Sequence, residues 1–83
     1  MTRIVFQDRD GRPLAGAVVA ITTAPAEMND IGYVTGDDGA IALTIPLPGS
    51  YGFTLTGADG GRLIASKQLQ PEGDATVTAH AMG

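Results

Sequence analysis

The chain contains no cysteine, no tryptophan and a single histidine among its 83 residues. Without cysteine there is no disulfide and no thiolate zinc site, so packing or a partner has to stabilise the fold. The lone histidine, His80, cannot build an imidazole zinc site, and no nucleophile can be placed beside it for a hydrolytic dyad. We therefore expect no enzymatic activity, no metal site and no cofactor.

Basic residues are also few and scattered. Five Lys and Arg residues stand against nine Asp and Glu residues, which gives a net charge of −4, whereas binding to a phosphate backbone needs clustered positive charge. No apolar run approaches the ~20 residues that cross a bilayer. The apolar stretch at residues 4–6 ends at once in Gln7 and Asp8, which is too short for a signal peptide. We expect no binding to nucleic acid or membranes, and a cytoplasmic location.

Glycine and proline, in contrast, are plentiful, at 12 and 5 residues. Nearly all of them lie between short apolar segments, as expected of tight turns. Within these segments apolar residues alternate with period two, and no helical repeat occurs. This pattern predicts one all-β domain over residues 1–83, built as a seven-stranded, two-sheet Greek-key sandwich. The predicted strands cover residues 4–7, 17–22, 32–35, 41–45, 51–56, 62–69 and 74–80.

Three segments resemble the carboxypeptidase regulatory-like, or transthyretin-like, domains. They are DGRPLAGAVV at residues 10–19, TGDDGAI at 35–41 and LPGSYGF at 47–53, in the order in which that family carries them. The residues have structural roles: Gly16 lets the chain bend back, Pro48 and Gly49 favour a type II turn, and the Tyr51 hydroxyl can reach a backbone partner. The resemblance implies a transthyretin-like topology.

The resemblance also bears on function. Bacterial transthyretin-like modules decorate larger assemblies, including the spikes of contractile injection systems, so export within such an assembly is the alternative to a cytoplasmic location. The similar hydroxyisourate hydrolases use two histidines, an arginine and a C-terminal Tyr-Arg-Gly-Ser. This sequence has only His80 and lacks that tetrapeptide. The resemblance therefore implies a non-enzymatic module.

Aspartates in the predicted turns have two interpretations. Carboxylates can cap turns by accepting backbone hydrogen bonds, or they can gather around calcium. We favour turn capping, because Pro13 and Leu14 follow the first cluster where further calcium ligands would be needed. The residues concerned are Asp8, Asp10, Asp37, Asp38 and Asp59.

A protein partner is the favoured ligand, because free edge strands of a sandwich pair readily with other chains, copies of the same chain included. The expected contact surfaces are the irregular loop at residues 23–31 and the last strand, residues 74–80. The candidate residues are Glu27, Met28, Asn29, Asp30, Tyr33, Thr76, Thr78 and His80. The alternative is a carbohydrate- or small-ligand-binding domain, for which Tyr33 is the one aromatic residue expected to be exposed.

Overall fold

A computed structural model describes residues 2–26 and 32–81. This part of the chain forms strands and no helix, as predicted, and so contains no helix that could cross a membrane. The strands are β1 (Thr2–Gln7), β2 (Val18–Thr23), β3 (Tyr33–Val34), β4 (Ala40–Leu43), β5 (Gly49–Thr56), β6 (Arg62–Leu69), β7 (Gly73–Thr78) and β8 (His80–Ala81).

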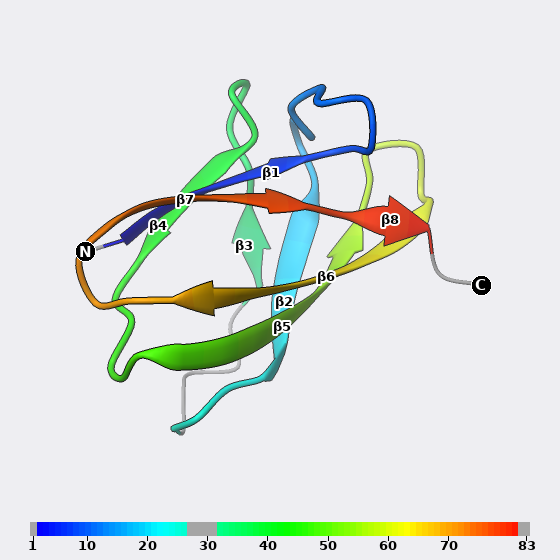
Figure 1. Cartoon of the computed structure of the whole chain (residues 1–83). Helices are drawn as coiled ribbons and strands as arrows, with labels where there is room; N and C mark the ends of the chain where they lie inside the picture. Colours follow the sequence, from blue (N-terminus) through cyan, green and yellow to red (C-terminus); the bar gives the residue numbers. More distant parts are fainter. Residues whose placement is uncertain (1, 27–31, 82–83) are drawn as a thin grey trace.

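The strands form two sheets, in accordance with the predicted sandwich (Figure 1). One sheet has the order β4-β1-β7, with β1 antiparallel to β4 and parallel to β7. The other has the order β3-β2-β5-β6-β8, in which every neighbouring pair is antiparallel. β7 is thus an edge strand of the smaller sheet, as expected for the last strand of the chain.

The core lies between the two sheets and follows the predicted alternation. Phe6 of β1 and Phe53 of β5 meet edge to face, with ring centroids 5.2 Å apart. Each fully buried large apolar side chain contributes about 1.5–3 kcal/mol to the free energy of unfolding. Because the chain has no disulfides, this packing is the main source of its stability. The predicted inward residues are all buried, namely Ile41, Leu43, Ile45, Tyr51, Phe53 and Leu55.

The predicted last strand is divided in the structure. Instead of one strand over residues 74–80, β7 joins the smaller sheet and β8 joins the larger one. The chain changes sheets at Ala79, whose N–H donates to the Gln7 carbonyl at 2.8 Å and whose side chain is 1% exposed. A methyl group fits this crossing between the layers, so the number of strands rises from seven to eight.

The first two motifs of the resemblance contact each other. Thr35 donates its N–H to the Ala17 carbonyl at 2.9 Å and accepts the N–H of Gly16 at 3.1 Å. The oxygen of its hydroxyl group accepts a hydrogen bond from the Ala17 N–H at 2.8 Å, and the O–H donates to the Leu14 carbonyl. Gly16 has a φ of +66°, which confirms the predicted bend. Thr35 therefore holds the segment that leads into β2.

The third motif is confirmed in one feature and wrong in another. The Tyr51 hydroxyl donates to the Leu47 carbonyl at 2.6 Å, the backbone contact expected for it. The predicted type II turn at Pro48-Gly49 does not form, because Gly49 has a φ of +154° rather than about +80° and already begins β5. Glycine is favoured there because side chains rarely adopt this φ and because a Cβ would lie 3.1 Å from the ring of Pro25.

Candidate protein-binding edge

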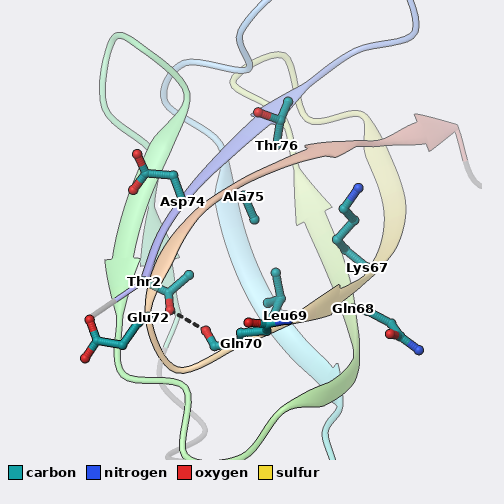
Figure 2. Close-up of a pocket in the computed structure, with 9 residues that line it drawn as sticks. All are labelled: Thr2, Lys67, Gln68, Leu69, Gln70, Glu72, Asp74, Ala75 and Thr76. Atoms are coloured by element: carbon teal, nitrogen blue, oxygen red, sulfur yellow. Dashed lines mark hydrogen bonds between the residues drawn. The ribbon is translucent and has the colours of Figure 1, made fainter.

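β6 and β7 separate into different sheets after the turn that joins them and leave an opening between them (Figure 2). At its closed end the Thr2 hydroxyl donates to the Gln70 carbonyl at 2.6 Å, which ties the turn to β1. A hollow of about 350 Å³ lies in this opening. It is lined by Thr2, Lys67, Gln68, Leu69, Gln70, Glu72, Asp74, Ala75 and Thr76.

The outer edge of β7 carries unpaired backbone groups. The Ala79 N–H donates to the Gln7 carbonyl, so the backbone groups of Ala79 are directed toward β1. Alternate residues of a parallel strand bond the same neighbour, so Val77 and Ala75 are directed toward β1 as well. The register therefore turns the N–H and C=O groups of Asp74, Thr76 and Thr78 away from β1. In the part of the chain that the structure describes, no strand pairs with that edge.

β6 also has a free edge along the same opening. At the hairpin the Gly57 N–H donates to the Gly61 carbonyl, so the backbone groups of Gly61 are directed toward β5. Every second residue after it along β6 is directed toward β5 in the same way. From the register, Ser66 and Gln68 direct their backbone groups away from β5. Within the described residues β8 pairs only with the start of β6, at Leu63 and Ile64, so it does not cover these groups.

Lys67 distinguishes the two edges. Its register partner is the buried Tyr51, so Lys67 occupies an inward-facing position, yet it is exposed because β7 has moved away. In Figure 2 it extends from β6 toward β7. An inward-pointing charge on an edge strand opposes further strand pairing, so β6 is protected. β7 carries neither lysine nor proline and exposes Thr76 and Thr78, whose branched side chains suit a strand.

The candidate residues have different outcomes. Thr76 and Thr78 lie exposed on β7, and the Thr78 hydroxyl accepts a hydrogen bond from the Gln7 amide at 3.2 Å. His80 is exposed on β8 and shares a shallow hollow with Thr78 and Arg9. The remaining loop candidates, Glu27, Met28, Asn29 and Asp30, lie outside the described residues.

Tyr33 was expected to be an exposed aromatic residue, and this is wrong. It pairs with Val19 and lies half-buried against the core. Tyr33 faces the sandwich interior, whereas Val34, the next residue of β3, faces outward and is 66% exposed.

Turn capping was predicted for five aspartates, and three of them, Asp8, Asp38 and Asp59, cap turns in the structure. Among the described residues, the carboxylates of Asp10 and Asp37 accept no such backbone hydrogen bond. The Asp8 carboxylate accepts the N–H groups of Asp10 and Arg12, both at 2.9 Å. Asp59 and Asp38 each accept the N–H two residues further along the chain, at 2.9 and 3.1 Å. Among residues 2–26 and 32–81, no group of three or more acidic or histidine side chains could hold a metal ion.

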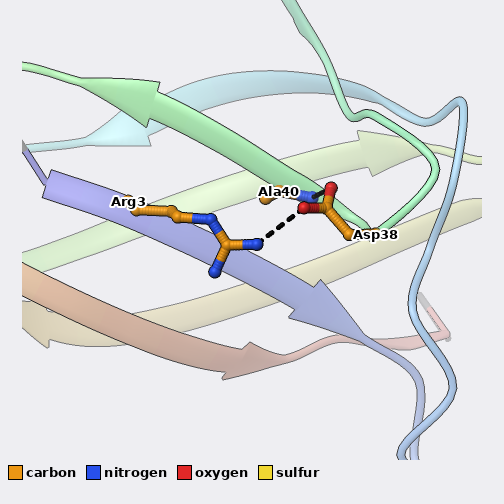
Figure 3. Close-up of polar contacts among 3 residues, drawn as sticks. All are labelled: Arg3, Asp38 and Ala40. Atoms are coloured by element: carbon orange, nitrogen blue, oxygen red, sulfur yellow. Dashed lines mark hydrogen bonds and ion pairs between the residues drawn. The ribbon is translucent and has the colours of Figure 1, made fainter.

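Asp38 also pairs with Arg3 on the outer side of the smaller sheet (Figure 3). The guanidinium and carboxylate approach to 2.6 Å, and both side chains are about half exposed. The hydrogen bond from Arg3, supported by the Ala40 N–H, lowers the pKa of Asp38 below its ordinary 3.8. The pair connects β1 to the turn before β4 and contributes little to stability at such exposure.

Substituting Arg3→Gln is expected to raise the pKa of Asp38 back toward 3.8, because the main cause of the shift is removed. A lowered carboxyl pKa stabilises the fold above pH 3.8, and this contribution is lost as the pH falls through the folded-state pKa. An NMR pH titration of the Asp38 side-chain carboxyl measures the change, with Arg62→Gln as the control. Identical titration curves in all three proteins would contradict the assignment.

Sequence reasoning missed Lys67, although one signal for it was present. The inward positions of β6 read Leu63, Ala65, Lys67 and Leu69, so the apolar alternation is broken at the third. A charged residue at an inward position of a strand indicates that the opposite sheet does not cover the strand at that point. The same signal would have pointed to the opening beside β7.

A scan against models of known protein families gives no match for this chain, and a search of curated protein sequences gives none either.

Proposed function

We propose that this chain is a non-enzymatic protein-interaction module that binds an extended segment of another protein as an added strand on β7. The observation that carries the proposal is the row of N–H and C=O groups at Asp74, Thr76 and Thr78, which no strand of the described residues pairs. Strand addition draws its affinity from such main-chain hydrogen bonds. A small core without disulfides also gains stability when a partner binds only the folded state.

The family and the assembly belong to the same proposal. A transthyretin-like, Greek-key sandwich of the carboxypeptidase regulatory-like type is supported by the contact between the segments at residues 10–19 and 35–41, which meet at Thr35. On this basis the partner would be another subunit of a larger bacterial assembly, such as a contractile injection-system spike, with which the module would be exported from the cytoplasm.

The substitution Thr76→Pro tests the proposed edge. The N–H of Thr76 points away from β1, so proline removes a donor from the free edge without breaking the β1–β7 ladder. Peptides are first selected against the natural protein from a displayed library of random ten-residue sequences. We expect Thr76→Pro to weaken their binding at least tenfold in calorimetry, because a main-chain bond is lost and the proline ring obstructs the incoming strand.

Thr76→Val is the matched control, because it keeps the N–H and the branched shape and should bind normally. Hydrogen exchange provides the second measurement, in which bound peptide should slow exchange at the amides of Asp74, Thr76 and Thr78. Failure to select any peptide would overturn the proposal. So would peptides that leave these amides unprotected or bind Thr76→Pro as well as the natural protein.

A further inference from the structure

Lys67 occupies a position on β6 at which the opposite layer of the sandwich is missing. Its register partner Tyr51 is buried, so the Lys67 side chain starts on the inward face of its sheet, and yet it is exposed. It lines the hollow between β6 and β7 together with the buried Leu69 and the half-buried Ala75. A strand added to the outer edge of β7 would extend the smaller sheet over this hollow and cover the lysine.

No carboxylate of the described residues neutralises Lys67. Among residues 2–26 and 32–81 the one ion pair joins Arg3 to Asp38. Glu72 and Asp74 line the same hollow, but in Figure 2 their carboxylates lie outside the curve of the β6–β7 turn, whereas Lys67 lies inside it. Solvent therefore compensates the ammonium group while the edge is free, and a covering strand would remove that solvent.

A covering strand has to supply the missing negative charge. Burying an ammonium group without a partner is costly, whereas a hydrogen-bonded carboxylate offsets the cost. Ala75 pairs with the fully buried Ile4, so it is the residue of β7 that faces inward and lines the hollow. The residue of an added strand beside Ala75 faces the same way, because cross-strand partners share a face of the sheet. Since the Ala75 side chain is small, a longer side chain beside it can extend into the hollow toward Lys67.

The outward face of β7 disfavours an acidic residue. Asp74 precedes Ala75 in the strand and is exposed on that face. A carboxylate at an outward position beside Asp74 would meet a like charge, which destabilises a strand pair. The whole chain has a net charge of −4, so an acidic segment also gains nothing from its overall field. A preference for an acid is therefore confined to the inward face of the added strand.

We infer that the segment added to β7 carries an aspartate or glutamate at the inward position beside Ala75, where its carboxylate pairs with the Lys67 ammonium group. This inference rests on the proposed strand addition and names the feature by which the site selects its partner. The main-chain bonds at the free edge accept many sequences, whereas Lys67 rejects a segment with an apolar or basic residue at this position.

A double-mutant cycle between peptide and protein tests the inference. In the tightest peptide selected against the natural protein, each acidic residue is replaced in turn by glutamine, and binding is measured by calorimetry. One replacement should weaken binding to the natural protein about tenfold or more, but leave binding to Lys67→Gln nearly unchanged. Lys67→Glu should reverse the preference and favour the peptide with lysine at that position. Because Lys67 is exposed, both variants should fold normally.

Arg62→Gln is the matched control. It removes one positive charge from the outward face of the same strand, where Arg62 pairs with Thr56, and it should keep the preference of the natural protein. A preference that falls equally in Arg62→Gln and Lys67→Gln would contradict the inference, because it would then reflect the overall charge of the protein.

Hydrogen exchange distinguishes failure of this inference from failure of the proposed function. Peptides that protect the amides of Asp74, Thr76 and Thr78 but show no acidic preference, or keep it in Lys67→Gln, would overturn the pairing with Lys67 and leave strand addition in place. Acidic peptides that bind Thr76→Pro as well as the natural protein would overturn both, because they would not bind at the edge. A library that yields no peptide would also overturn both.

Discussion

Replacing Gly39 with alanine is expected to lower the free energy of unfolding by about 3 kcal/mol or more. Gly39 has a φ of +77°, and an alanine in this left-handed region costs roughly 1–2 kcal/mol. An added Cβ would also lie 2.6 Å from the Phe6 carbonyl oxygen and 2.9 Å from the Leu14 nitrogen. Both are backbone atoms, so the clash can be relieved only by moving β1, at a further cost of about 1–3 kcal/mol.

Gly11→Ala is the matched control. Its φ of +85° is similar, but no atom lies within 4 Å of the added Cβ, so only the backbone cost of roughly 1–2 kcal/mol applies. Measuring the free energy of unfolding of both variants in urea separates the cost of the backbone conformation from the cost of the Cβ clash. A domain of this size has a total stability of about 4–12 kcal/mol, so the difference is readily measured. Equal losses in both variants would show that the Gly39 site relaxes.

Thr35→Val is expected to lower the free energy of unfolding by about 2–5 kcal/mol. Thr35 is 3% exposed, and its hydroxyl accepts the Ala17 N–H and donates to the Leu14 carbonyl. Valine has nearly the same shape but leaves both backbone groups unpaired inside the protein, at roughly 1–3 kcal/mol each. The urea midpoint should fall, with little change in the denaturant slope.

Thr35→Ser provides the specific control, because it keeps the hydroxyl and removes only a methyl group, which costs about 1 kcal/mol. Thr44→Val tests the same chemical change at an exposed position, where we expect about 0.5 kcal/mol or less. If Thr35→Val is no worse than Thr35→Ser, the hydroxyl does not hold the segment before β2. Neither residue lies on β7, so peptide binding by folded protein should be unchanged.

Several particular features were predictable because they depend on neighbouring residues. The alternation over residues 41–45 and 51–56 identified the buried side chains, since successive residues of a strand face opposite sides. Gly11 and Gly16 have the positive φ expected of their turns. The role of Asp8 followed in the same way, because a turn aspartate bonds backbone groups two to four residues away.

Features that join distant segments were not predictable. The need for glycine at position 39 comes from Phe6 and Leu14, and a Cβ added at position 49 would lie 3.1 Å from the ring of Pro25. The change of sheet at Ala79 depends on its bond to Gln7, at the opposite end of the chain. None of these partners can be chosen by a local rule, because many arrangements satisfy the same alternation.

The candidate sites follow the same division. By itself the sequence determined an all-β chain with Thr76 and Thr78 on an exposed late strand, because period-two patterning and turn residues are local properties. Only the tertiary structure decided that β7 lies parallel to β1, with an outer edge that no other strand of residues 2–26 and 32–81 pairs, and that Val18 and Val34 become neighbours. Strand pairing is set by long-range packing, and the candidate edge of β7 arises from which strands end up side by side.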